Sequence, residues 1–281
     1  MGYLSGGVGV VPELPEVETT RRGVSPLLEG RRISAVNVRN PRLRQPVLAT
    51  LPQRLNGLRL RTVERRAKYL LFRFDVGTLI VHLGMSGSLR VVAPGTALKK
   101  HDHVEIVFDA KYCLRLHDPR RFGLVVWTEE PIAEHRLLQH LGPEPWDDRF
   151  SGKYLHGCAH RRKAAVKNFI MDGRIVVGVG NIYASESLFR AGVHPNRAAG
   201  RISLKRYTTI VSAVREVLEE AITVGGTTLR DFVQSDGEPG YFRLQLKVYG
   251  RTGERCECKS GTIRQQVIGQ RSSFYCPCCQ R

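Results

Sequence analysis

The sequence predicts an α+β protein made of a β-sandwich, a helical domain and a cysteine-rich finger, in that order. Between residues 33 and 127, short β-like runs alternate with Gly, Pro and Asp, which is typical of a sandwich. Between residues 151 and 225, apolar residues recur at the helical period. Cysteines crowd into residues 256–279, a pattern that favours a metal site over disulfides in a cytosolic chain.

The chain is long enough for two domains with full cores, and its composition changes along its length. We divide it into five segments: a leader (1–11), a β-sandwich domain (12–130), a proline-rich linker (131–150), a helical domain (151–240) and the finger (241–281).

Pro12-Glu13, next to the leader, is followed at once by the opening of a helix. As a true N-terminus, Pro12 would carry a secondary amine that can attack a sugar C1′ and form an iminium, with Glu13 as general acid or base. In the chain as written, its nitrogen is an amide, which cannot react in this way. Because GTG encodes valine and also starts translation in bacteria, Val11 is a candidate start and residues 1–11 are expected to be absent from the native protein. A real, flexible extension is the alternative.

The first helix is expected to begin at Pro15, with acidic residues in its first turn, and to end at Gly30. Alternation and β-branched content then predict strands at Ile33–Val38, Leu60–Val63, Tyr69–Phe74, Thr78–Leu83, Ser88–Val92, His103–Phe108, Cys113–His117 and Leu124–Trp127.

Helical patterns follow the sandwich. A short helix is expected near Ile132–Leu141, and others at Lys153–Cys158 and Lys163–Met171. A glycine-rich turn leads to a helix that Asn181 would cap and Gly192 would stop, and its N-terminus could bind a DNA phosphate. A last periodic helix runs from Ser203 to Gly225-Gly226.

The formal net charge of +18 suits a polyanionic partner, although ribosomal and membrane-surface proteins can be equally basic. No apolar run is long enough to span a membrane, and the leader is a poor secretory signal, so a cytoplasmic, nucleoid-associated protein is expected. The sequence has no heptad pattern or obvious exposed apolar stripe that would indicate a subunit interface, which favours a monomer.

Four loops carry unusual residues: Arg65–Tyr69, His82–Ser88, Asp118–Gly123 and Ser235–Tyr241. The third loop, Asp118–Gly123, places arginines beside an aromatic residue. Proteins insert such side chains into a base stack to fill the gap that a displaced base leaves. Three of these loops also have a purely structural interpretation. The first loop can be a solvated strand end, Met85 in the second can belong to the core, and the fourth can be a surface connection without a functional role.

From Pro12 to Arg281, the chain resembles the bacterial formamidopyrimidine-DNA glycosylases, a family related to endonuclease VIII. The matching motifs are Pro12–Glu18, Arg65–Leu71, His82–Gly87, Lys100–His103, Asp118–Gly123, Val177–Tyr183, Ser235–Gly237 and the cysteine-rich tail.

The resemblance implies a β-sandwich catalytic domain, a helix-two-turn-helix domain and a zinc finger, with double-stranded DNA bound in the cleft between. It also implies base excision repair: removal of oxidised purines such as 8-oxoguanine and formamidopyrimidines, then strand cleavage at the abasic site by β,δ-elimination.

Roles for individual residues are also implied by the resemblance. Pro12 would be the nucleophile and Glu13 the proton donor, with Lys68 and Arg271 assisting elimination and holding phosphates. Met85, Arg120 and Phe122 would fill the gap left by the flipped base, and Arg120 would face the orphaned cytosine. His101, Arg162 and Asn181 would bind phosphates. The loop containing Ser235, Asp236, Gly237 and Tyr241 would close over the lesion.

The finger departs from the family pattern, which has Cys-x2-Cys twice, because Lys259 stands where the second ligand is expected. One structural Zn²⁺ would be held by Cys256, Cys276, Cys279 and either Cys258 or Cys278. We favour Cys258, because residues 276, 278 and 279 cannot easily all point at one ion. The third possibility, besides Cys258 or Cys278 as the fourth ligand, is a finger that folds without a metal ion.

Three other functions compete with this one. An endonuclease VIII-type enzyme would remove oxidised pyrimidines. A catalytically inactive protein that binds lesions or DNA follows if the leader is retained. A basic zinc-ribbon protein of ribosomes or RNA would need neither the Pro-Glu pair nor the wedge residues.

Overall fold

The computed structural model describes residues 11–228 and 246–281. The chain divides into two compact units. The first unit contains Glu16–His135, together with Pro12. The second contains Arg136–Val224 and Arg243–Arg281, and the short segment Glu13–Pro15 also belongs to it.

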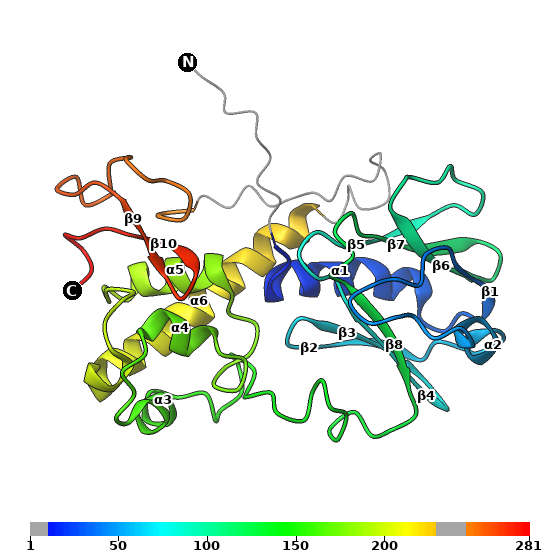
Figure 1. Cartoon of the computed structure of the whole chain (residues 1–281), viewed down its shortest axis with the longest axis horizontal. Helices are drawn as coiled ribbons and strands as arrows, with labels where there is room; N and C mark the ends of the chain where they lie inside the picture. Colours follow the sequence, from blue (N-terminus) through cyan, green and yellow to red (C-terminus); the bar gives the residue numbers. More distant parts are fainter. Residues whose placement is uncertain (1–10, 229–245) are drawn as a thin grey trace, which may run out of the picture. The chain divides into compact units, whose positions relative to one another are not determined.

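The first unit contains two antiparallel four-stranded sheets (Figure 1). In one, the strand order is β1 (Ile33–Val38), β6 (Asp102–Phe108), β7 (Tyr112–His117) and β5 (Ser88–Val92). In the other, it is β2 (Thr62–Arg66), β3 (Tyr69–Phe74), β4 (Gly77–His82) and β8 (Leu124–Thr128). Alternate residues of both sheets join one apolar cluster with α1 (Leu14–Leu28) and α2 (Leu51–Leu55).

The second unit is helical and ends in a β-hairpin. Its elements are α3 (Gly152–Ala159), α4 (Val166–Met171), α5 (Asn181–Arg190), a 3-10 turn (Ala199–Arg201), α6 (Leu204–Thr228) up to Val224, β9 (Arg264–Ile268) and β10 (Arg271–Tyr275). The apolar stripe of α6 is buried from Tyr207 to Ile222, and the Tyr207 hydroxyl donates to the Ala199 carbonyl at 2.8 Å.

The predicted fold class is confirmed, since a β domain, a helical domain and a hairpin that carries the cysteines follow one another along the chain. Gly30 adopts a φ of +79° just after α1, which explains why this helix stops there. The strands Ile33–Val38, Tyr69–Phe74 and Ser88–Val92 have the predicted bounds.

Three helix predictions were wrong. Residues 132–141 form turns instead of a helix. The helix at 163–171 begins only at Val166, because Ala165 pairs with Ala198 in a β-bridge. Finally, α6 continues through Gly225 and Gly226, although each glycine costs a helix about 1 kcal/mol relative to alanine.

In the parts of the chain that the structure describes, no helix is both long enough and apolar enough to cross a bilayer.

Candidate functional site

Glu13 is the most firmly held of the predicted catalytic residues. Its side chain is buried, and its carboxylate accepts backbone N–H bonds from Gly180 at 2.8 Å, Ile182 at 3.1 Å and Tyr183 at 3.5 Å. These amides open α5, where the helix dipole also favours a negative charge. The N-terminus of α5 therefore fixes both carboxylate oxygens.

The glycine-rich turn before α5 is shaped to receive Glu13 and Leu14. A Cβ at Gly180 would lie 2.2–2.5 Å from the Glu13 carboxylate, and one at Gly178 would lie 2.2 Å from Leu14 Cδ1. Two predictions are corrected here. The N-cap of α5 is Gly180 and not Asn181, and its first-turn amides bind the protein's own carboxylate instead of being open to a DNA phosphate.

Lys167 is a buried cation that the sequence reading missed. From α4, its ammonium donates to Asn181 Oδ1 at 2.5 Å, to the Ser272 carbonyl at 3.0 Å and to Ser273 Oγ at 2.7 Å. Burial lowers the pKa of Lys167 to about 8, the Glu13 charge acts against this shift, and Arg271 adds to it. The only sequence signal was a lysine at an inward position of a helix.

Asn181 completes this arrangement. Its amide group donates to the Ser272 carbonyl at 3.1 Å and to the Tyr249 hydroxyl at 3.3 Å. Together, Lys167 and Asn181 attach the start of α5 to β10, the strand that begins with Arg271.

Arg271 follows a tight hairpin turn at Gly269-Gln270, in which both residues have positive φ. A Cβ at Gly269 would lie 2.3 Å from the Asn168 side-chain nitrogen, so the turn lies directly against α4. The exposed Arg271 is therefore presented from a hairpin that is fixed at its turn and at Ser272.

Four cysteines form a compact cluster beside this hairpin. The sulfurs of Cys256, Cys258, Cys276 and Cys279 all lie within 4.8 Å of one another. The Cys256–Cys279 and Cys258–Cys276 sulfur distances are 3.7 and 3.8 Å. Thiolates bound tetrahedrally at about 2.3 Å from a zinc ion lie about 3.8 Å apart, so the four residues fit a metal ion.

Cys278 is not a member of this cluster. Its sulfur points to the Ser260 carbonyl, 3.3 Å away, and its side chain is exposed. The isolated Cys113 and Cys158 are free thiols.

In the first unit, Pro12 is buried and Lys68 lies at the turn between β2 and β3. Ala67, before Lys68, has a φ of +56°, a conformation that a non-glycine residue adopts only when its surroundings require it. The Arg65 guanidinium donates to the Ala67 carbonyl at 3.0 Å and to Glu18 at 3.1 Å, which helps to hold this turn.

The three predicted wedge residues come from two loops that one buried carboxylate joins. Asp118 accepts from Ser86 Oγ at 3.0 Å and from the Gly123 N–H at 2.8 Å, and it is completely buried. Met85 and Phe122 remain 38% and 43% exposed, and the Arg120 guanidinium lies 5.0 Å from the Phe122 ring centre. The structure therefore brings these residues together as an apolar and cationic projection.

His82 sets the geometry of the Met85 loop. Its Nδ1 accepts the Gly84 N–H at 2.9 Å, which requires that nitrogen to be unprotonated. Burial, together with the positive charges of Lys68 and Arg44, lowers the pKa of His82 to about 4, so the ring is neutral at physiological pH.

The remaining predicted residues are more dispersed. His101 belongs to the first unit, where its ring lies 5.8 Å from that of His117. Arg162 belongs to the second unit and lies over Phe169 at 5.4 Å. Ser235, Asp236, Gly237 and Tyr241 lie outside the residues that the structure describes.

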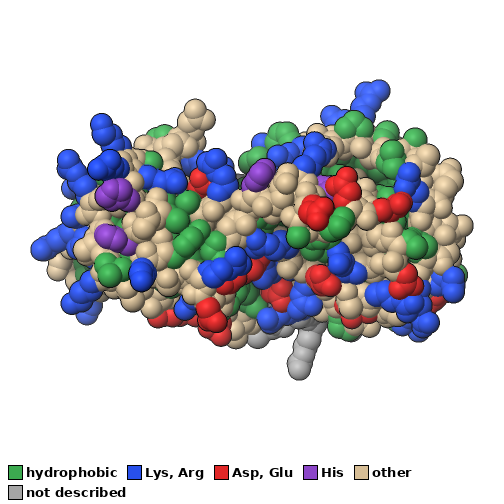
Figure 2. Space-filling model, turned by 90° about the horizontal axis from the view of Figure 1, so that it is seen from below, with side chains coloured by type: hydrophobic (Ala, Val, Ile, Leu, Met, Phe, Trp, Pro, Cys, Tyr) green, Lys and Arg blue, Asp and Glu red, His purple; other side chains and the backbone are tan. Residues whose placement is uncertain are grey.

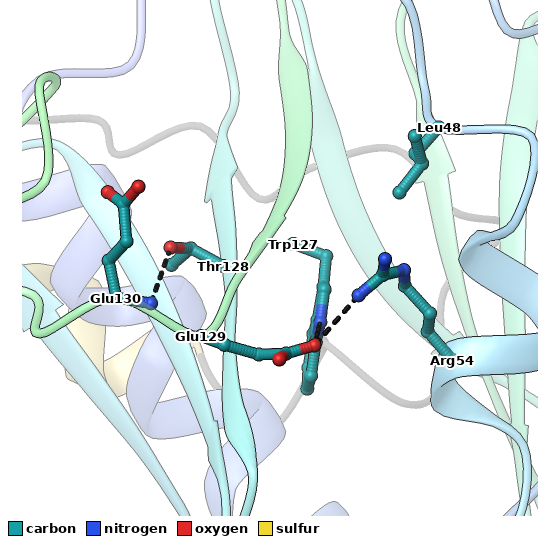
Figure 3. A pocket seen from close by; sticks show the side chains of 6 residues that line it. All are labelled: Leu48, Arg54, Trp127, Thr128, Glu129 and Glu130. Atoms are coloured by element: carbon teal, nitrogen blue, oxygen red, sulfur yellow. Dashed lines mark hydrogen bonds and ion pairs between the residues drawn. The ribbon is translucent and has the colours of Figure 1, made fainter.

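Lys and Arg side chains are spread over the face shown in Figure 2, with fewer Asp and Glu among them. An open pocket of about 510 Å³ lies at the Thr128 end of β8, whereas the wedge loop 118–123 precedes the other end of that strand. Glu129 and Glu130 line it, and Glu129 is paired with Arg54 (Figure 3). Its acidic lining does not suit a phosphate backbone.

Two family models match the chain. Residues 11–125 match the formamidopyrimidine-DNA glycosylase N-terminal domain, and residues 141–233 match the formamidopyrimidine-DNA glycosylase H2TH domain. The chain belongs to the formamidopyrimidine-DNA glycosylase family.

Similar proteins agree with this assignment. The formamidopyrimidine-DNA glycosylases of Methylococcus capsulatus and Alkalilimnicola ehrlichii are 58% and 60% identical to the chain, and each alignment covers 96% of the chain and all of the relative. The predicted family membership is thus confirmed.

Solved structures of the Lactococcus lactis formamidopyrimidine-DNA glycosylase have the same fold. One, bound non-covalently to DNA with an abasic site, is 29% identical with a TM-score of 0.84. Others contain Fapy-dG DNA, at 31% identity and a TM-score of 0.86, and DNA with an oxidised pyrimidine, at 30% and 0.87. Each covers 96% of this chain and all of the Lactococcus lactis chain.

Proposed function

We propose that this protein is a base excision repair enzyme that removes oxidised purines, including 8-oxoguanine and formamidopyrimidines, from duplex DNA and then cleaves the strand as an abasic-site lyase. Family membership supplies the reaction class. The observation in this chain that supports it most is the buried Glu13 carboxylate, held by three backbone amides directly beside Pro12. The substrate would be bound as double-stranded DNA by a cytoplasmic, nucleoid-associated monomer.

In this reaction, the Pro12 nitrogen forms a bond to C1′ of the damaged nucleoside. The C1′–base bond breaks with its electron pair leaving on the base, and the proton lost by the proline nitrogen balances the one that the base takes up. Glu13 gives a proton to the base or to the sugar ring oxygen, whose bond to C1′ opens to leave an iminium. The iminium then acts as an electron sink. Loss of a proton from C2′ lets the 3′ phosphate leave with the C3′–O electron pair (β-elimination), and loss of a proton from C4′ lets the 5′ phosphate leave with the C5′–O electron pair (δ-elimination).

This chemistry requires Pro12 to have a free amine, and therefore to be the first residue of the active protein. We propose that residues 1–11 are absent from it. Intact mass measurement on active protein expressed from its own gene would test this, and a mass that includes them would contradict the mechanism.

The remaining roles are proposals that the local geometry supports. Lys68, at a constrained turn, and Arg271, on a fixed hairpin, would hold phosphates and assist elimination. Met85, Arg120 and Phe122 would fill the gap in the duplex. His101, Arg162 and Asn181 would bind phosphates, and Asn181 would have to exchange its long bond to Tyr249 to do so. The loop containing Ser235, Asp236, Gly237 and Tyr241 would close over the flipped base.

We propose that the finger holds one structural Zn²⁺ through Cys256, Cys258, Cys276 and Cys279. The sulfur distances fit a tetrahedral ion, and four thiolates suit zinc. Metal analysis should find one zinc per chain, and Cys256→Ser should abolish it, whereas Cys278→Ser should retain it. Equal loss in both variants would contradict this ligand set.

Borohydride trapping tests the function directly, because the hydride adds to the iminium carbon and makes the link permanent. A duplex containing 8-oxoguanine opposite cytosine should become linked to Pro12 as the terminal residue, as shown by peptide mapping. DNA binding without trapping, in protein that retains the leader, would indicate an inactive binding protein.

Removal of oxidised pyrimidines is the second candidate, since the Lactococcus lactis enzyme has been crystallised with DNA that contains an oxidised pyrimidine. Excision rates on thymine glycol and 8-oxoguanine, measured side by side, would decide the preference. We expect the purine to be preferred.

A further inference from the structure

The sheet β1-β6-β7-β5 carries a layer of charged side chains on the face opposite its apolar core. Arg90, Glu105 and Arg115 alternate along their strands with residues of the core cluster, so they point away from it. Asp102 joins them at an irregularity in the pairing of β6 with β7. The Asp102 and Arg115 side chains are only 1% and 3% exposed.

These buried charges are paired with one another. Asp102 binds Arg90 at 2.7 Å, Arg115 at 3.4 Å and His117 Nδ1 at 2.9 Å. Glu105 accepts two bonds from Arg115, at 2.7 and 3.0 Å. Replacing either partner alone would leave a buried charge uncompensated.

The same two side chains also reach the backbone of the loop formed by residues 93–101. Arg115 donates to the Thr96 and Ala97 carbonyls, both at 3.1 Å. Asp102 accepts the Lys99 N–H at 2.9 Å. The planar fork of arginine can bind two loop carbonyls and a carboxylate at once, which a lysine ammonium cannot do with the same geometry.

The 93–101 loop ends in Lys99-Lys100-His101. Both lysines are exposed. The His101 carbonyl accepts the Asp118 N–H at 2.9 Å, so this end of the loop is joined to the start of the 118–123 wedge loop. The loop backbone therefore connects a buried ionic layer to two exposed lysines and a histidine beside the wedge.

We propose that Arg115 and Asp102 are positioning residues for DNA binding, which hold the 93–101 loop so that Lys99, Lys100 and His101 meet the phosphate backbone together. This inference rests on the proposed function, in which His101 binds a phosphate. Because Arg115 and Asp102 are buried, they act through the loop and not by touching DNA.

Limited trypsin digestion of the free protein tests the loop attachment. In Arg115→Lys the loop should open more often, so trypsin should cleave after Lys99 and Lys100 about fivefold faster. Cleavage after Arg42, in another exposed segment, is the internal reference for this ratio. Asn37→Ala is the matched control, since it removes a bond to Glu105 but touches no loop residue, and it should change the ratio by less than about twofold. An unchanged ratio in Arg115→Lys would overturn the proposal.

The salt dependence of binding to a duplex with an abasic-site analogue tests the link to DNA. Arg115→Lys should lower the slope of log Kd against log salt by about 1–2, at about 0.9 per lost phosphate contact, while the single-turnover rate at saturating enzyme stays unchanged. In a protein whose Lys99, Lys100 and His101 are all replaced by alanine, the same substitution should have no further effect on the slope. A further fall would show that Arg115 acts elsewhere.

Two outcomes separate this inference from the proposed function. Faster trypsin cleavage with an unchanged salt slope would overturn the positioning role while leaving excision of oxidised purines intact. Wild-type protein without glycosylase activity would count against the proposed function, whereas the trypsin ratio would still report on the loop. If Arg115→Lys does not fold, as judged by urea unfolding, Asp102→Asn serves instead, because it removes the charge that pairs with Arg115 and weakens the bond from the Lys99 N–H, and the same rise in the cleavage ratio is expected.

Discussion

Two buried carboxylates, Glu13 and Asp102, are held in opposite ways. Glu13 is bound by three neutral backbone amides at the start of α5. Asp102 is paired with two arginines and a histidine on the outer face of a sheet. Amides fix a carboxylate without cancelling its charge, whereas guanidinium groups fix it and neutralise it. The first arrangement fixes the orientation of a carboxylate next to Pro12, and the second suits a scaffold.

Replacing Glu13 should have the largest effect. Glu13→Gln keeps the size of the side chain but replaces one oxygen that accepts N–H bonds with an amino group, and it removes the proton-exchanging carboxyl. We expect excision to fall by about 10²–10⁴-fold, the usual contribution of general acid–base catalysis. Single-turnover kinetics on 8-oxoguanine DNA would measure this fall. A loss confined to DNA affinity would mean that Glu13 is structural, like Asp102.

Gly180→Ala tests whether the position of the carboxylate matters as much as its presence. The new Cβ would lie 2.2–2.5 Å from the Glu13 carboxylate and must displace it. Misplacement by about 1 Å can reduce a rate by about 10²-fold. Gly157→Ala is the control, because nothing lies within 4 Å of its Cβ in α3, and it should raise the unfolding free energy by about 0.5–1 kcal/mol with unchanged kinetics.

Lys167→Met should have a smaller effect, because Lys167 acts through Asn181, Ser272 and Ser273. We expect strand cleavage to slow by about tenfold as Arg271 loses its fixed position. Because the pKa of Lys167 is lowered to about 8, wild-type cleavage should also decline as the pH rises through this value and the ammonium loses one of its three donors. Rates measured from pH 7 to pH 9 should show this decline in the wild type and not in Lys167→Met.

Which of these contacts the sequence could predict depends on distance along the chain. Strand bounds such as Tyr69–Phe74 depend on local alternation, and the motif around Pro12 was recognisable from its neighbours. The partner of Glu13 was not, because the amides of Gly180 and Ile182 lie more than 160 residues away. The glycine-rich turn predicted an anion site there, but not which anion binds to it.

Lys167 and Arg115 were missed for a related reason. Each looks like an ordinary cation in a basic chain until the fold buries it among acceptors. The helix expected at 132–141 failed because an apolar period also fits a series of turns.

Replacing His82 should have the smallest effect, and it extends the comparison to a buried group that is neutral. Its ring is held by a hydrogen bond from the Gly84 N–H and not by an ion pair. Its folded pKa, about 4, lies below the ordinary value of 6.5, so the unfolded chain binds a proton that the folded protein excludes. The stability contributed in this way is complete above pH 6.5 and is lost as the pH falls towards 4. Between pH 7.5 and pH 5 we expect a loss of about 1–2 kcal/mol. In His82→Asn, the side-chain oxygen can still accept the Gly84 N–H but does not titrate, so urea unfolding at the two pH values should show a loss smaller by that amount. An equal loss in both proteins would mean that the protonation of other groups dominates the acid sensitivity of the first unit.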